Sequence, residues 1–408
     1  MKIRLLTGCI ALALAGCGGS SNSSTETPTP APTPTPAPQI QKGIFLDSPV
    51  AGINYRTDTI TAGVTNAQGE FEYIDGENVT FYLGDLIFPT AKASAQVTPA
   101  DLGGGLATTT TVNILQLLQS LDDNGNPDDG IAITDTSKSA FVGTGLDISS
   151  ENFDSSVSAI LTSMNKTLVT EEAAKAHFSS TLNGQLTGSW LFSEGAGKRN
   201  VLTFFNNNNY IIVHEHSDID DNGDQVAGSA EYGTYSYDPT TQKLALKVTG
   251  ESDKSGGLAD NKGAANLDMK LTGMALDITF ADDENNTVRF NKISDSNNPL
   301  VGAWFLREEN INSDNILTIL PNNQYAIVHT NNQEAYNGAA VMAVSGEFGS
   351  FSYTGDVFTT TGITAEANGP GGLYDKDSPA FSATLTIMAD KSLTFTNPSE
   401  NFTFSRVK

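Results

Sequence analysis

The chain has 408 residues and carries 47 acidic against 22 basic side chains, which gives a net charge of −25 at pH 7. A surface this negative repels phosphate backbones and anionic head groups, so the composition argues against nucleic acid as a partner. Both cysteines, Cys9 and Cys17, lie near the start of the chain. The body of the protein therefore has no thiol for disulfides, thiolate metal sites or thiol chemistry.

Residues 1–16 have the layout of a bacterial signal peptide, with a basic start and a short apolar run. The run ends in Leu14-Ala15-Gly16-Cys17, which resembles the lipobox of bacterial lipoproteins. The resemblance implies cleavage before Cys17, acylation of that residue with palmitate among its chains, and anchoring in a membrane. Gly18 follows where an aspartate would signal the inner membrane, so the resemblance implies the outer membrane, on its periplasmic or surface-exposed face. An ordinary secretory signal with an incidental cysteine is the alternative.

Residues 17–41 are expected to form a tether. Gly, Ser and Asn come first, and an alternation of Thr or Ala with Pro follows. Such a segment cannot build a core and favours extended polyproline II, at about 3.1 Å per residue. We therefore expect it to hold the folded part a few nanometres away from the membrane.

Residues 42–90 predict a small β-sandwich. Residues 66–69 have the composition of a tight turn, and Phe71 and Tyr73 alternate after it on one strand face. The spacing of Pro49-Val50-Ala51-Gly52 and of Thr-x-x-x-Gly-x-Phe from Thr65 resembles the carboxypeptidase-regulatory-like β-sandwiches. That resemblance implies a spacer or a carbohydrate-contacting accessory module.

Residues 91–185 change to helical periodicity. Apolar side chains recur at helical spacing over residues 111–121 and again over residues 153–164. Thr170, followed by two glutamates, predicts the start of a third helix, because acidic side chains are favourable near a helix N-terminus. We expect a helical connector whose apolar stripes form core.

The rest of the chain is a duplication. Gly188-Ser189-Trp190 returns as Gly302-Ala303-Trp304, and Glu231-Tyr232-Gly233 returns as Glu347-Phe348-Gly349. The offset between equivalent residues stays between 114 and 116. A register this steady across the whole segment indicates two copies of one domain.

Each copy, at residues 186–293 and 300–408, predicts a β-barrel. Short runs rich in β-branched and aromatic residues are separated by Asn, Asp and Gly clusters. The strands expected in the first copy are 188–194, 199–206, 209–217, 229–237, 242–250, 266–272, 274–281 and 286–292. Eight antiparallel strands can close on themselves and remove exposed edges, which predicts a mainly β protein with two tandem eight-stranded antiparallel barrels. A two-sheet sandwich is the alternative.

The ends of each copy resemble the lipocalin-like up-and-down barrels, because Gly-x-Trp opens each copy and a basic residue stands near its end. In that family the first-strand Trp packs at the closed end under a cation from the last strand. The resemblance therefore pairs Trp190 with Lys292 and Trp304 with Arg406, and a cation over an indole face contributes about 0.5–2 kcal/mol. The repeated Gly-Gly-Leu segments, expected at the barrel mouths, are residues 256–258 and 371–373.

An eight-stranded barrel has an interior that side chains fill or that encloses one small ligand. Alternation along the third strand of each copy places one aromatic, one aliphatic and one imidazole side chain on the same face. The side chains expected to face the lumen, and to contact an apolar ligand there, are Tyr210, Ile212, His214, Tyr325, Ile327 and His329. For each histidine, a hydrogen-bonded position in the barrel wall is the alternative.

Two acidic loops have the spacing of calcium ligands. Asp and Asn at alternate positions are what a hard cation takes in an EF-hand-like loop. The expected ligands are Asp218, Asp220, Asn222 and Asp224 in the first loop, and Asp122, Asn124, Asn126 and Asp128 in the second. Both loops lack the bidentate Glu at the twelfth position, and acidic turns without a metal are the alternative. Either site would be structural, or would mediate adhesion.

The sequence has no catalytic signature. Nucleophile-elbow, zincin, phosphate-loop and dinucleotide motifs are missing. Ser163-Met164-Asn165-Lys166 matches a Ser-x-x-Lys pattern but lacks its companion motifs. His214 and His216 share one strand face, yet a catalytic zinc needs a third protein ligand, and none is evident.

The anchor, the tether and the duplicated β modules predict a lipid-anchored cell-envelope protein with a non-enzymatic binding role in adhesion, matrix contact or partner contact. Its partner would be a surface polysaccharide, a protein or a small apolar ligand. The alternative function is a lipocalin-like carrier. A remote alternative is a hydrolase whose site, with His214 or Glu215, lies between the barrels.

Overall fold

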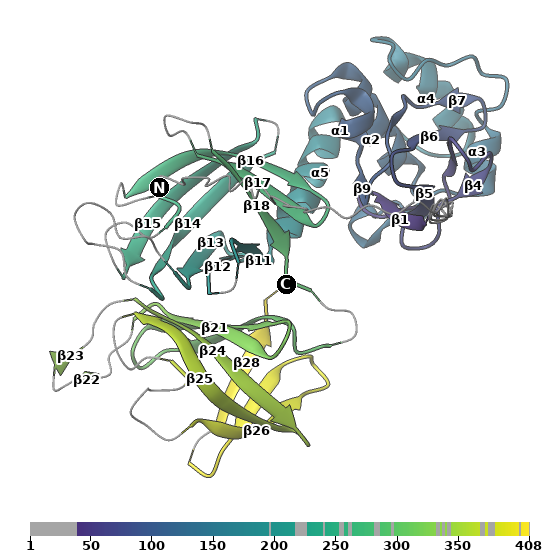
Figure 1. Cartoon of the computed structure of the whole chain (residues 1–408). Coiled ribbons are helices and arrows are strands. Elements are labelled where there is room, and N and C mark those ends of the chain that lie inside the picture. The colour runs from purple at the N-terminus through teal and green to yellow at the C-terminus, as the bar shows by residue number, and fades with distance from the viewer. Residues whose placement is uncertain are drawn as a thin grey trace, which may run out of the picture. The chain divides into compact units, whose positions relative to one another are not determined.

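The computed structural model, drawn in Figure 1, describes most of the chain that follows the tether. The described residues are 39–195, 197–216, 227–239, 241–252, 257–259, 263–280, 286–294, 298–331, 335–336, 339–340, 344–367, 372–373, 380–399 and 401–407. The predicted signal peptide and Cys17 lie outside these ranges. Within them, no helix has both the length and the apolar character needed to span a bilayer.

The N-terminal part of the fold combines short strands with helices. Its strands are β1 (Ile40–Phe45), β2 (Val50–Ala51), β3 (Asn54–Thr57), β4 (Gly63–Val64), β5 (Glu70–Ile74), β6 (Asn78–Leu83), β7 (Leu86–Ile87), β8 (Ala91–Lys92), β9 (Gln96–Val97) and β10 (Ile131–Ala132). One sheet has the order β5-β1-β9, another joins β4, β3, β6 and β7 with β8 also on β6, and β10 pairs with β2. The helices are α1 (Pro99–Gly103), α2 (Thr109–Leu121), η1 (Pro127–Asp129), α3 (Asp135–Ser139), α4 (Phe153–Ser163) and α5 (Glu171–Leu186).

The three longer helices begin close to where the sequence signals place them. Of these helices, α2 packs against both α4 and α5. Thr108 caps α2 and Thr170 caps α5, each accepting a backbone N–H bond on its side-chain oxygen. Every residue of α2 from Thr111 to Leu121 is buried. Strand residues such as Phe45 and helix residues such as Leu118 belong to one hydrophobic core. The sheets and the helices therefore pack as one unit, although the sequence divides them at residue 90.

The first copy of the repeat is a closed up-and-down barrel of eight antiparallel strands (β11 to β18, teal to green in Figure 1). Its strands are β11 (Gly188–Ser193), β12 (Arg199–Phe204), β13 (Asn209–His214), β14 (Ala230–Asp238), β15 (Lys243–Glu251), β16 (Ala264–Thr272), β17 (Ala275–Thr279) and β18 (Thr287–Lys292). They follow the expected runs within two or three residues at most ends, and pairing of β11 with β18 closes the ring. The barrel prediction is confirmed, and the two-sheet sandwich is excluded.

The second copy is also a closed eight-stranded antiparallel barrel. Its strands are β19 (Gly302–Glu308), β20 (Ser313–Leu320), β21 (Gln324–His329), β24 (Ser345–Thr354), β25 (Val357–Ala367), β26 (Ser382–Ile387), β27 (Leu393–Thr396) and β28 (Asn401–Arg406). A two-stranded pair, β22 (Ala335–Tyr336) and β23 (Ala339–Ala340), lies between β21 and β24 in the chain. Register shifts at Phe348/Gly349 and Ser350/Phe351 interrupt the pairing of β24 with β25.

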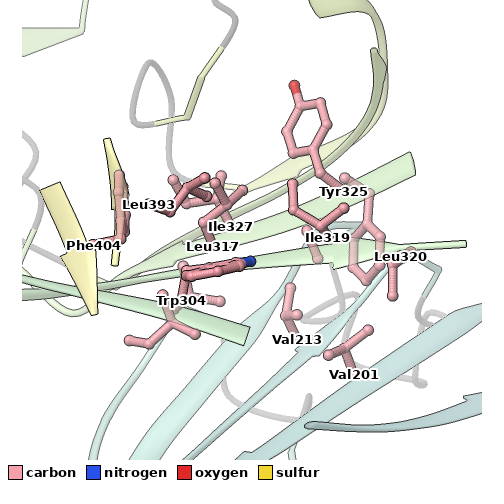
Figure 2. Close-up of a cluster of buried hydrophobic side chains, with 14 of the residues drawn as sticks. Val201, Val213, Trp304, Leu317, Ile319, Leu320, Tyr325, Ile327, Leu393 and Phe404 are labelled. Carbon is pink, nitrogen blue, oxygen red and sulfur yellow. The ribbon is translucent and has the colours of Figure 1, made fainter. Parts of the chain in front are cut away.

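One outer face of each barrel is buried against the other barrel. On β13, Tyr210 and Ile212 belong to the first barrel's core, whereas Ile211 and Val213 belong to a cluster with residues of the second barrel. Figure 2 shows Val213 within that shared cluster, beside side chains of β20 and β21. A strand buried on both faces has a continuous apolar run rather than an alternating one, which explains the sequence Tyr-Ile-Ile-Val.

Candidate functional site

A tryptophan and a basic side chain close one end of each barrel. Lys292 Nζ lies 4.7 Å from the centre of the Trp190 ring, and Arg406 Cζ lies 4.6 Å from that of Trp304. Each cation also donates hydrogen bonds to two backbone carbonyls of the segment that leads into its barrel. Burial lowers the pKa of Lys292 to about 8. These are the contacts that the lipocalin-like resemblance implies.

A buried carboxylate lies inside the first barrel. Tyr210 donates its hydroxyl hydrogen to Glu231 Oε1 over 2.8 Å, and the Leu258 N–H donates to the same oxygen over 3.1 Å. Burial raises the pKa of Glu231 to about 7, although the hydrogen bonds from Tyr210 and two backbone amides oppose the rise. Burial and the neighbouring carboxylate also raise the pKa of Tyr210 far above its ordinary value, so the phenol remains a donor.

The second barrel repeats this arrangement with Glu347. Tyr325 donates to Glu347 Oε1 over 2.6 Å, and the Leu373 N–H donates to it over 3.0 Å. A Cβ atom on Gly257 or Gly372 would lie 2.1 or 1.8 Å from the carboxylate of its own barrel. Glycine is repeated here because the loop backbone passes directly against the buried acid. Of the two Gly-Gly-Leu segments predicted at the mouths, the described residues 257–258 and 372–373 thus lie against the buried acids of the barrel core.

The protein's own side chains occupy both interiors. The first barrel's core contains Trp190, Leu202, Phe204, Tyr210, Ile212, Tyr235, Leu244, Leu246, Leu258, Leu267, Met269, Leu276, Ile278, Val288 and Phe290. Tyr325 and Ile327 lie in the corresponding core of the second barrel, with Trp304, Leu317 and Phe404 (Figure 2). Tryptophan and tyrosine fill space that an apolar ligand would need. The packing favours solid barrels over hollow ones.

The two predicted lumen histidines take hydrogen-bonded positions in the barrel walls. His214 Nδ1 lies 2.6 Å from Asn200 Oδ1, and His329 Nδ1 lies 2.7 Å from Asn315 Oδ1. Burial lowers the pKa of His329 to about 4, so this imidazole is neutral at pH 7. In the part of the chain that the structure describes, no three His, Cys, Asp or Glu side chains are grouped to hold a metal.

A buried ion pair joins the two barrels. Arg199 donates from Nε to Glu215 Oε2 over 2.6 Å and from Nη2 to the other carboxylate oxygen. Thr364 of the second barrel donates to Glu215 over 2.9 Å, and Gln324 accepts from Arg199 Nη1. Burial alone would raise the pKa of Glu215, but the bonds and charge of Arg199, together with Thr364, outweigh it and lower the pKa. The carboxylate that the hydrolase alternative considered therefore serves as a structural tie.

A groove lies where the barrels meet, at the end of β12. The rings of Phe205 and Phe305 are 6.0 Å apart, with their planes at 67°. Together with Asn207 they line both of two adjoining cavities of about 150 and 350 Å³. The other polar side chains that line the groove belong to Asn209, Tyr232, Thr249, Asp314 and Thr330 in the smaller cavity, and to Asn206, Asp390, Ser392, Ser405 and Arg406 in the larger.

Of the two predicted calcium loops, only the second lies within the described residues. The ligands of the first loop, Asp218, Asp220, Asn222 and Asp224, lie outside the described residues. In the second loop, the Asp122 carboxylate accepts the N–H groups of Asn126 and Ala132, each over 2.8 Å, and Asn124 Oδ1 accepts the Asn126 N–H over 2.7 Å. Asp128 Oδ1 lies 3.1 Å from His177 Nδ1. These oxygens are used by the turn itself, and calcium at either loop stays a prediction.

Sequence reasoning did not single out Glu231, Glu347 or Arg199. The repeated Glu-aromatic-Gly motif was a signal for the two acids, because an acid kept in two divergent copies marks a shared structural need. Arg199 gave no such signal, since Asp314 stands at its place in the second copy. No family model, curated protein or solved structure matches the chain.

Proposed function

We propose that the chain is a lipid-anchored protein of the bacterial outer membrane whose tandem barrels bind a surface polysaccharide, in adhesion or matrix contact. The groove between Phe205 and Phe305 carries this proposal. The filled barrel interiors support a binding site on the outer surface over a carrier site in a lumen. No chemistry at the barrels is part of the proposal.

The lining of the groove suits a sugar chain. A half-buried ring such as Phe305 packs against the C–H face of a pyranose, while amide, carboxylate and hydroxyl groups bond its hydroxyls. The adjoining cavities, about 150 and 350 Å³, are of the size that takes one or two sugar units. The net charge of −25 disfavours an acidic polymer, so the proposal commits to a neutral polysaccharide.

Binding of the full chain to an array of neutral oligosaccharides tests the groove. We expect Phe305→Ala to weaken binding by about tenfold or more, because truncating an aromatic side chain that anchors a binding site costs more than about 1 kcal/mol. Tyr353→Ala is the matched control, since Tyr353 is an exposed aromatic residue on β24 outside the groove. Equal binding by all three proteins would place the sugar elsewhere.

The anchor is tested separately. Cys17→Ser should move the protein from the membrane fraction to the soluble fraction of cells, and protease treatment of intact cells should cut a surface-exposed form. Native mass spectrometry of protein purified from its host tests the carrier alternative. A copurified apolar mass would contradict the solid barrels and support the carrier.

A further inference from the structure

A polar cluster lies in the N-terminal part of the fold, outside both barrels. Ser48 lies in the turn after β1, and His177 lies on α5. Ser48 Oγ is 3.2 Å from His177 Nε2, and Asp128 Oδ1 is 3.1 Å from His177 Nδ1. With its proton on Nδ1, the imidazole donates to Asp128 and accepts from Ser48.

This arrangement supplies the parts that an activated serine requires. A hydroxyl lies within reach of a base, and a third group orients the base. Ser48 is 6% exposed and the His177 side chain 10% exposed, whereas the Asp128 side chain is 82% exposed. The hydroxyl and the imidazole are shielded from bulk water, while the carboxylate reaches them from the solvent side.

The backbone beside the hydroxyl has free donors. In the described part of the chain, neither the Asp47 N–H nor the Ser48 N–H donates a hydrogen bond to another residue. Asp47 is fully buried, so water does not reach its amide. Buried amides without an acceptor are rare in folded proteins. An oxyanion hole uses such donors, and the nucleophile's own N–H is a recurrent member of it.

A second carboxyl group lies near the ring without competing for its proton. Asp47 Oδ1 is 3.9 Å from His177 Nε2, and Gln119 donates to the Asp47 carboxyl over 3.0 Å. Burial raises the pKa of Asp47 to about 8, although the bond from Gln119 opposes the rise. The Asp47 carboxyl is therefore mostly neutral at pH 7, and Asp128 is the carboxyl group within hydrogen-bond distance of the imidazole.

We propose that Ser48, His177 and Asp128 form a hydrolytic site for short-chain acyl esters. Ser48 Oγ attacks the ester carbonyl carbon and passes its proton to His177 Nε2. The bond from that carbon to the alcohol oxygen breaks, the alcohol leaves with the proton, and the acyl group stays on Ser48. The narrow exposure of Ser48 restricts the acyl group to a short one.

Water completes the cycle. It attacks the acyl carbon of the Ser48 ester and gives one proton to His177 Nε2. The bond to Ser48 Oγ then breaks, the oxygen takes that proton back, and the carboxylic acid leaves. Asp128 is a positioning residue throughout, because it touches only the imidazole. This activity is independent of polysaccharide binding at the barrels.

The full-length protein in detergent, treated with a fluorophosphonate probe and with p-nitrophenyl acetate, tests the site. We expect a covalent adduct that peptide mass spectrometry maps to Ser48, and ester hydrolysis above the buffer rate. Ser48→Ala should abolish both, and His177→Gln should slow hydrolysis by about 10²-fold or more. Asp128→Asn should slow hydrolysis on the order of tenfold, and Asp128→Glu should restore it, which a merely structural role would not do.

Ser139→Ala is the matched control, because Ser139 is an exposed serine on α3 away from any imidazole partner, and its rate should equal that of the wild type. Circular dichroism confirms the fold of each variant. If Ser48→Ala does not fold, the position of the adduct on the wild-type chain decides. A wild-type protein without an adduct on Ser48, or hydrolysis that survives Ser48→Ala, would overturn the proposal.

Discussion

The two barrels share the residues that close and fill them and differ in residues that face each other. Each has a tryptophan under a cation, a tyrosine bonded to a buried glutamate, and an asparagine beside a histidine. By contrast, Arg199 and Glu215 of the first barrel have Asp314 and Thr330 at the equivalent places in the second. The shared residues show what each barrel needs in order to fold, and the differing residues show how the two barrels contact each other.

These differing residues explain why the two barrels contribute unequally to the interface between them. In the second barrel, the Asp314 N–H donates to Thr330 Oγ1 over 2.8 Å, and the Asp314 carboxylate pairs with Arg307 over 2.7 Å at a half-exposed site. Among the described residues, only the first barrel contributes a buried ion pair to the interface. A second buried pair would add a second desolvation penalty, which such pairs seldom recover in full.

The largest expected effect on stability comes from breaking the Arg199–Glu215 ion pair, which the second barrel lacks. Arg199→Met leaves Glu215 buried without its cation, and we expect the free energy of unfolding to fall by about 3–5 kcal/mol. Urea denaturation of the full chain measures it. Arg289→Met is the matched control, because Arg289 pairs with Asp277 at an exposed site and its loss should change little. If both variants lost a similar amount of unfolding free energy, the Arg199–Glu215 pair would have to be exposed to water as the Arg289–Asp277 pair is.

A shared feature should give equal effects in both barrels. Gly257→Ala and Gly372→Ala each place a methyl group against a buried carboxylate, which we expect to cost about 1–3 kcal/mol of unfolding free energy. Gly184→Ala in α5 meets no atom within 4 Å and should be neutral or stabilising by up to about 1 kcal/mol. Thermal denaturation compares the three. A loss confined to one barrel would break the equivalence of the two loops.

The closed ends sharpen the comparison, since one copy uses Lys292 and the other Arg406. Exchanging the two, as Lys292→Arg or Arg406→Lys, keeps a cation over the indole, and we expect a loss below about 1 kcal/mol. Lys292→Met removes the cation and two carbonyl bonds and should cost about 2 kcal/mol. Thermal denaturation at fixed pH distinguishes these outcomes. Equal losses for Lys292→Arg and Lys292→Met would contradict a role for the charge.

The smallest net effect is on pH dependence, because two groups act in opposite directions. The pKa of Glu231 rises from 4.5 to about 7 on folding, so its contribution to stability is full below pH 4.5 and is lost as the pH rises through 7. The pKa of His329 falls from 6.5 to about 4, so its contribution is full above pH 6.5 and is lost as the pH falls toward 4. Between pH 4.5 and 7, the stability of Glu231→Gln relative to the wild type should increase as the pH rises, and that of His329→Gln relative to the wild type should decrease. The reverse pattern would refute these assignments.

Much of the fold could be predicted from the sequence because the barrel strands are defined by local patterns. The run expected at 229–237 is β14 at Ala230–Asp238, and the closing Trp–cation pairs are those that the resemblance to lipocalin-like barrels implies. The sequence pattern could not show whether the strands before residue 90 and the helices after it share one core. An apolar face of a strand or a helix has the same pattern whether it packs in a separate core or in a shared one. The continuous run at β13 likewise did not reveal that its outer face meets another barrel.

Sites depend on contacts that local patterns do not encode. Ser48 and His177 are 129 residues apart, and Arg199 and Gln324 are 125 apart. Neither pair has a motif, because each consists of common residue types whose meaning comes from their distance in space. Glu231 is intermediate: its repetition in the sequence marks it as needed, but only its burial and its three hydrogen bonds show why.

The sequence by itself determined the duplication and, to within a few residues, the strands of the first barrel, because hydrophobic period, turn residues and repeat register are local properties of the chain. The tertiary structure alone decided that aromatic side chains fill the barrels, that a buried ion pair ties one barrel to the other, and that a serine, an imidazole and a carboxylate meet beside β1. These features arise from burial and desolvation, which depend on neighbours far away in the chain and raise or lower the pKa of a carboxyl group only once those neighbours are in place.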